Sequence, residues 1–196
     1  MNKAGKVADL EEIITDEELV EQALAGRGEV FAHLYERYYS RAYRLAYGMT
    51  GQHEAAEDLT QEIFMRTYQK LDQYGGQASF ATWFYRLAVN RCLNYRKQEK
   101  RLSSEDARDI EMLPLPGAAR QMEKNIFQKQ AQAHIHRALL SLKPGVRMIV
   151  ILKDIEGLSY EEIAERADCS KGTIASRLNR GRRLLARKLA HLRGAF

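Results

Sequence analysis

The chain has 196 residues, of which 45% are hydrophobic and 29% are charged, and its net charge is +5. This composition excludes bulk disorder and a disulfide scaffold, and the length allows one large domain or two small ones. No apolar run approaches the roughly 18 residues of a membrane span, and the acidic N-terminus lacks the apolar stretch of a signal peptide. We therefore expect no membrane insertion and a cytoplasmic location.

The charges are strongly sorted along the chain. Residues 9–21 hold seven acidic residues and no basic one, residues 86–101 hold six basic residues and one acidic one, and residues 171–196 hold eight basic residues and no acidic one. Two separate basic tracts favour two points of contact with a polyanion such as nucleic acid. The alternative is that both tracts are solvated helix faces, and charge alone does not choose between them.

Hydrophobic residues recur at helical spacing throughout, and no segment alternates with period two for long, so the sequence predicts an all-α fold. One apolar stripe, expected to belong to the core, consists of Phe31, Leu34, Tyr35, Tyr38, Ala42 and Leu45. A second helix is predicted over 54–71, with Leu59, Ile63 and Leu71 turned inward.

The outward face of this second helix carries Asp58, Gln61 and Glu62 at positions i, i+3 and i+4, so the three side chains form one polar patch. Acidic residues near a helix N-terminus also complement the helix dipole, which is the simpler interpretation. No intramolecular use of the patch is evident from the sequence.

A loop with two adjacent glycines, residues 72–77, precedes a third helix predicted over 80–101. One face of that helix carries an aromatic ring, two amides and three cations at spacings of three and four: Trp83, Arg86, Asn90, Asn94, Lys97 and Arg101. Amides can bond to base edges, cations hold phosphates, and an aromatic ring supports an unstacked base. Because a purely solvating face would rarely include tryptophan, the pattern favours nucleic-acid contact.

Residues 102–117 show no clear period and contain two of the three prolines of the chain, which is typical of a linker. We therefore predict two small helical domains, 1–101 and 123–196, joined by a flexible linker over 102–122.

The second half ends in the pattern of a helix-turn-helix. Pro144 suits the first turn of a helix that runs to Ile155, and Gly157 suits its left-handed cap. Ser159 and Glu162 form a capping box for a short helix, and Ser170 is positioned to cap a longer, basic one. Such a second helix should enter a major groove, where serine, asparagine and arginine can bond to base edges.

The inward stripe of the basic helix consists of Ile174, Leu178, Gly181, Leu185 and Leu189. Its candidate DNA-contacting residues are Lys171, Thr173, Ser176, Arg177, Asn179, Arg180 and Arg183. Arg182, Arg187 and Lys188 are expected to meet DNA backbone or solvent.

These motifs together resemble the extracytoplasmic-function (ECF) group of bacterial sigma factors. Residues 56–64, AEDLTQEIF, are similar to the helix of that family that binds core polymerase, and residues 80–90, FATWFYRLAVN, are similar to its melting and −10 recognition helix. Residues 157–164, GLSYEEIA, with residues 172–180, GTIASRLNR, are similar to its −35 reader.

The resemblance implies a sigma2 domain and a sigma4 domain that direct core RNA polymerase to promoters and begin DNA melting. It implies that Asp58, Gln61 and Glu62 meet the polymerase. The −10 single strand would contact Tyr74, Gln77, Trp83, Arg86, Asn90, Asn94 and Lys97. The helix-turn-helix would read double-stranded −35 DNA, and an anti-sigma factor would mask the same surfaces. Ala175 stands where similar proteins often carry a longer polar or basic residue.

Two other classes of protein remain open. A helix-turn-helix regulator with an N-terminal sensing or dimerisation domain is the alternative, although it would not need both the acidic patch and the tryptophan-bearing face. An enzyme is not indicated, because the sequence has no P-loop, GxSxG or HExxH motif, and we expect no cofactor or metal. His134 and His136 diverge on a helix and are interpreted as surface residues, whereas Cys92 and Cys169 are interpreted as buried or bystander thiols.

Overall fold

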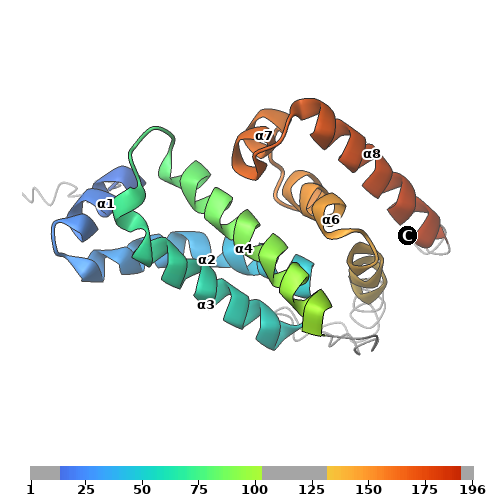
Figure 1. Ribbon diagram of the computed structural model, residues 1–196, viewed down its shortest axis with the longest axis horizontal. Helices are drawn as coiled ribbons and strands as arrows, with labels where there is room; N and C mark the ends of the chain where they lie inside the picture. The colour runs from blue at the N-terminus through green and yellow to red at the C-terminus, as the bar shows by residue number, and fades with distance from the viewer. Residues whose placement is uncertain (1–13, 103–131, 191–196) are drawn as a thin grey trace, which may run out of the picture.

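The computed structural model in Figure 1 describes the backbone of residues 14–102 and 132–190, and the side chains of residues 14–95 and 132–190. Within these ranges all regular secondary structure is helical, which confirms the predicted all-α fold. None of the helices in the described ranges has both the length and the apolar character that a bilayer crossing demands. The predicted linker, 102–122, lies outside the described residues apart from the backbone of its first residue.

The N-terminal half packs four α-helices around one aromatic and aliphatic core. They are α1 (Asp16–Leu24), α2 (Phe31–Thr50), α3 (His53–Gln69) and α4 (Phe80–Leu102), with short 3-10 turns η1 (Gly28–Val30) and η2 (Leu71–Gln73). The ring of Phe84 on α4 lies 4.8 Å from that of Tyr38 on α2 and 5.3 Å from that of Phe64 on α3, measured between centroids. The predicted stripe faces this core, because Leu34, Tyr38, Ala42 and Leu45 are buried.

The described part of the C-terminal half starts with residues 132–140, which are helical, and continues through α6 (Pro144–Val150) into a π-helical turn, η3 (Ile151–Ile155). The helix-turn-helix follows as α7 (Tyr160–Ala167) and α8 (Lys171–Lys188). α8 packs on α6 at Gly181, where an added Cβ would lie 2.6 Å from a methyl carbon of Val150 and 3.0 Å from one of Val146. Gly181 therefore permits the close approach of the two helices.

The two halves pack against each other, with α4 beside α7 and α2 beside α6 (Figure 1). Arg147 on α6 is a charged residue buried in this interface, only 1% exposed. Its Nη1 donates to the main-chain oxygen of Met49 on α2 at 2.8 Å, and its Nε donates to that of Leu139 at 2.9 Å. Because each bond satisfies a carbonyl that is hidden from water, the guanidinium joins the end of α2 to the C-terminal half.

Two further contacts hold α2 to the C-terminal half. Arg44 and Glu156 form a two-pronged ion pair, with Nε–Oε1 at 2.7 Å and Nη2–Oε2 at 3.0 Å. Tyr47 stacks on His136 with ring centroids 4.5 Å apart and planes at 10°. The interpretation of His136 as a surface histidine is therefore wrong, because its ring is half-buried between the two halves.

Candidate nucleic-acid and polymerase interfaces

The three residues of the polar patch on α3 differ in their contacts: two are exposed and one forms an ion pair within the chain. Asp58 and Gln61 are exposed, whereas the carboxylate of Glu62 is paired with Arg91 on α4, whose Nε lies 2.5 Å from Oε2. The Arg91 side chain is only 8% exposed, so this pair has a structural use that spacing along α3 could not reveal. The expectation that all three residues lack an intramolecular use is wrong for Glu62.

The loop before α4 is bordered by an aromatic cluster. The ring of Tyr74 lies 5.5 Å from that of Trp83 and 5.8 Å from that of Phe80, measured between centroids. Phe80 is buried, while Tyr74 and Trp83 are half-buried and keep part of their surface at the solvent. Gln77 is exposed on the same loop. The arrangement can offer ring edges and an amide to a base that has left its stack.

Further along the same face of α4, Asn90 and Asn94 are exposed, as the spacing predicted. Arg86 is also exposed, but its Nε donates to the main-chain oxygen of Glu165 on α7 at 2.7 Å. The nearby guanidinium of Arg166 lies 4.8 Å from the ring centroid of Tyr85, and its Nε, although buried, has no hydrogen-bond partner among the described residues. The C-terminal half therefore occupies part of the candidate −10 face. The side chain of Lys97 lies outside the described residues.

The helix-turn-helix is shaped by local hydrogen bonds and backbone conformation at the start of α7 and in the turn to α8. Ser159 and Glu162 make the predicted capping box, with Ser159 Oγ accepting from the Glu162 amide at 3.1 Å and Glu162 Oε2 accepting from the Ser159 amide at 2.8 Å. Hydrogen bonding to Ser159 lowers the pKa of Glu162. Asp168 takes the left-handed conformation, φ 47°, in place of the glycine that often stands in such a turn. Ser170 then caps α8 through the Thr173 amide at 3.2 Å.

Most of the predicted −35 residues form an exposed stripe on α8, opposite its buried residues Ile174 and Leu178. The exposed members are Lys171, Ser176, Arg177, Asn179, Arg180 and Arg183, while Thr173 is half-buried in the cap. Lys171 Nζ bonds to Glu161 Oε1 at 2.5 Å in an exposed pair. Arg180 has no ion pair within the described residues.

Arg182 differs from its neighbours on α8. Its Nε lies 3.1 Å from Oδ2 of Asp154 on η3, and its Nη2 lies 2.5 Å from Oδ1 of the same carboxylate. The pair directs Arg182 toward its own half of the chain, but the side chain is still 54% exposed, so it meets solvent as expected, and a contact with DNA backbone stays a prediction. Arg187 and Lys188 remain exposed at the end of the helix.

Among the described residues, the thiols and histidines form no metal-binding cluster. Cys92 is fully buried, and burial raises the pKa of its thiol to about 12, which keeps it protonated. Burial also raises the pKa of the half-buried Cys169. In the part of the chain that the structure describes, no group of three His, Cys, Asp or Glu residues is placed to hold a metal ion.

Comparison with known proteins identifies the family to which this chain is similar. Residues 34–102 match sigma-70 region 2, and residues 132–185 match sigma-70 region 4. The chain is 34% identical over 191 residues to the ECF RNA polymerase sigma-E factor of Escherichia coli K12, covering 93% of this chain and 98% of that protein. It is 31% identical to the protein of that name from Haemophilus influenzae, covering 92% and 98%.

Solved structures share the fold at lower identity. The structure of CnrH in complex with the cytosolic domain of CnrY matches with a TM-score of 0.65 and 21% identity, over 90% of this chain and 97% of that one. The sigma factor RpoE in complex with the anti-sigma factor NepR from Bartonella quintana matches with a TM-score of 0.64 and 23% identity, over 82% and 96%. With two sigma regions matched in order and a relative aligned over nearly its whole length, the chain belongs to the ECF group of the RNA polymerase sigma factors.

Proposed function

We propose that this sigma factor directs core RNA polymerase to promoters by three separate surfaces, and that it begins DNA melting at one of them. The observation that carries the proposal is their chemistry: exposed acid and amide groups on α3, aromatic and amide groups at the start of α4, and a row of cations on α8. Residues 1–101 form the sigma2 domain and residues 123–196 the sigma4 domain in this proposal. The segment between them, 102–122, is the linker.

Asp58 and Gln61 make the principal contact with core polymerase. Both side chains are exposed and lie one turn apart on α3, so they can engage one helix of a partner. Glu62 contributes at the edge of this surface, because its carboxylate is shared with Arg91. A carboxylate and an amide that form no ion pair or side-chain hydrogen bond among the described residues suit a basic, polar surface on the polymerase.

Tyr74, Gln77 and Trp83 hold an unpaired base of the −10 element, and Asn90 and Asn94 contact the adjoining strand. Arg86 and Lys97 hold its phosphates. Unstacking a base costs a few kcal/mol, and aromatic contacts worth roughly 1–3 kcal/mol per base compensate for it. Arg86 becomes available when it leaves the Glu165 carbonyl.

The exposed stripe of α8 reads the −35 duplex in the major groove. Ser176, Asn179 and Arg180 face base edges, while Lys171, Arg177 and Arg183 contact phosphates, and Thr173 fixes the start of the helix. Phosphate contacts set the register of the helix on the duplex, and base contacts select the sequence.

The protein acts by binding and supplies no catalytic group, since polymerase carries out RNA synthesis. Its place of action is the cytoplasm, where polymerase and DNA are. An anti-sigma factor is its regulatory partner in this proposal. The support is family membership together with the fold shared with RpoE, which is bound to the anti-sigma factor NepR.

Reconstitution tests the proposal. The purified chain is added to core RNA polymerase on sheared genomic DNA of the source organism, and RNA 5′ ends are sequenced. We expect discrete start sites, absent with core polymerase alone, each preceded by two short sequence elements. If the chain binds DNA but neither binds core polymerase nor creates start sites, it is a regulator of the alternative class.

A further inference from the structure

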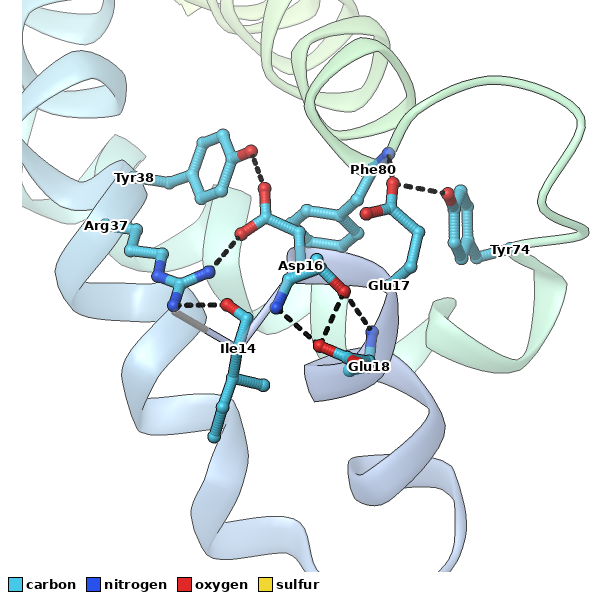
Figure 2. Close-up of polar contacts among 9 residues, drawn as sticks. Ile14, Asp16, Glu17, Glu18, Arg37, Tyr38, Tyr74 and Phe80 are labelled. Carbon is cyan, nitrogen blue, oxygen red and sulfur yellow. Dashed lines mark hydrogen bonds and ion pairs between the residues drawn. The ribbon is translucent and has the colours of Figure 1, made fainter. Parts of the chain in front are cut away.

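Three consecutive acidic residues at the start of α1 have three different tasks (Figure 2). Asp16 accepts from Arg37 Nη1 at 2.7 Å and from the Tyr38 hydroxyl, which fixes α1 to α2. Glu18 accepts from the Thr15 amide at 2.7 Å in the capping box of α1 itself. Glu17, between them, reaches a different helix.

The carboxylate of Glu17 lies at the entrance of α4. Its Oε1 accepts from the main-chain N–H of Phe80 at 3.1 Å and lies 3.3 Å from the Tyr74 hydroxyl (Figure 2). Ser79 caps the same helix by accepting from the Thr82 amide at 3.3 Å, so Glu17 satisfies an N–H that Ser79 leaves over. The negative charge also complements the positive end of the helix dipole.

Glu17 also limits the freedom of the loop. The Tyr74 hydroxyl lies 2.8 Å from the main-chain oxygen of Ala78, and its single proton can serve that oxygen or Glu17, but not both at once. An added Cβ at Gly75 or Gly76 would meet nothing within 4 Å, so this stretch of the loop has little packing of its own. The loop is therefore held against α4 largely by the contacts of Tyr74.

A carboxylate beside a DNA-binding surface is unfavourable for binding, because its negative charge repels phosphate, so its presence there calls for a structural role. We infer that Glu17 is a positioning residue for −10 recognition: it holds the first turn of α4 and the Tyr74 ring in the geometry that receives the unpaired base. This inference rests on the proposed function of the loop and of α4. Glu17 itself contacts no DNA, and it lies outside the part of the chain, 34–102, that matches sigma-70 region 2.

The experiment compares Glu17→Ala, Glu17→Gln and Glu21→Ala in the full chain bound to core polymerase. Glu21 is an exposed acid on the same helix and provides the matched control. The probes are a −10 single strand selected from a random pool by the wild-type holoenzyme, and a −35 duplex selected in the same way. All affinities are measured below the onset of thermal unfolding.

We expect Glu17→Ala to weaken −10 single-strand binding about tenfold, the effect of losing one charge-assisted hydrogen bond. Binding of the −35 duplex should be unchanged, and hydrogen exchange at the Phe80 amide should be faster. Glu17→Gln keeps an acceptor oxygen and should restore most of the affinity, while Glu21→Ala should resemble wild type.

Equal loss of −10 and −35 binding in Glu17→Ala would overturn the inference, because a general structural defect has no preference for one element. Unchanged −10 binding in Glu17→Ala would overturn it as well. If the wild-type holoenzyme selects no −10 single strand at all, the proposed function of α4 fails, which is a separate outcome.

Discussion

The Nε of Arg86 on α4 donates to the main-chain oxygen of Glu165 on α7 at 2.7 Å. One of the cations proposed to hold the −10 strand is thus engaged by the half of the chain proposed to read the −35 element. A guanidinium Nε–H cannot serve the Glu165 carbonyl and a DNA phosphate in the same orientation. In the proposed function, α4 and α7 must therefore separate at this point before this N–H can reach a phosphate of the −10 strand.

The first prediction concerns the Arg44–Glu156 ion pair, which joins the same two halves. The Glu156 side chain is only 2% exposed, so Arg44→Glu would place a second carboxylate against a buried one. Because Arg44 is itself half-exposed, we expect a cost of about 2 kcal/mol to the interface, less than for a fully buried pair. Spin labels at the exposed positions Glu36 and Ala186 should then report longer distances.

The charge-swapped variant, Arg44→Glu with Glu156→Arg, is the control for this experiment. It restores opposite charges at the same positions and should return the distance distribution toward that of the wild type. An unchanged distribution in Arg44→Glu alone would mean that the ion pair does not hold the halves together.

The second prediction separates two neighbours on α3. Asp58→Lys reverses the charge of an exposed side chain without an ion pair among the described residues, so it should leave thermal stability unchanged and weaken core-polymerase binding by several kcal/mol. Glu62→Gln should instead lower thermal stability, because Arg91 loses its charged partner. A titration against core polymerase measures the affinity, and a thermal melt measures the stability. Unchanged polymerase affinity in Asp58→Lys would show that this face of α3 does not contact the polymerase.

The third prediction concerns melting. Asn90→Ala with Asn94→Ala alters only exposed amides on α4, so the fold and the binding of closed promoter DNA should persist. Strand opening should be poor, because the separated strand loses hydrogen bonds that help to offset the few kcal/mol of unstacking. Permanganate reactivity of promoter thymines measures the opening. If promoter thymines react with permanganate in the double variant as in the wild type, these amides play no part in melting.

The fourth prediction concerns pH. Burial between the two halves lowers the pKa of His136, and the charge of Arg147 lowers it further, whereas its hydrogen bond to the Tyr47 carbonyl acts in the opposite direction. The stability that neutral His136 contributes is present above the unfolded pKa of about 6.5 and is lost as pH falls through the lower folded value. Acidification should therefore loosen the interface.

The measurement is the melting temperature between about pH 7.5 and about pH 5.5, the window that includes the ordinary histidine pKa. His136→Phe keeps a ring against Tyr47 but cannot take up a proton, so its melting temperature should fall less on acidification than that of the wild type. His33→Gln, a change at an exposed histidine on α2, should keep the wild-type slope. If the melting temperature falls equally on acidification in the wild type and in His136→Phe, His136 is not the source of the pH dependence.

The features predicted correctly from the sequence are those encoded within a few residues. The box of Ser159 and Glu162 and the left-handed Gly157, φ 74°, depend on local hydrogen bonds and backbone preference, so the spacing alone reveals them. The stripes of α2 and α8 follow from helical periodicity, which fixes the buried face before its partner is known.

The features that escaped prediction join residues far apart in the chain. Glu62 and Arg91 lie 29 residues apart, and Arg86 and Glu165 lie 79 apart. Periodicity places each side chain on a face, but it does not tell which other helix that face meets. The acidic run containing Glu17 likewise carries no signal that one member caps α4.

Arg180 offers the most direct test of the proposal that α4 and α8 read separate promoter elements. Start sites are mapped with holoenzymes that contain the wild type, Arg180→Ala or Arg187→Ala. Arg180→Ala should cost about 1–3 kcal/mol and relax one or two positions of the −35 element, while the −10 element keeps its sequence. Arg187→Ala should preserve both elements, weaken all sites about equally and lower the salt dependence by roughly one unit. If Arg180→Ala lowers affinity but leaves the −35 sequence preference intact, Arg180 contacts phosphate and the account of base reading by α8 is contradicted.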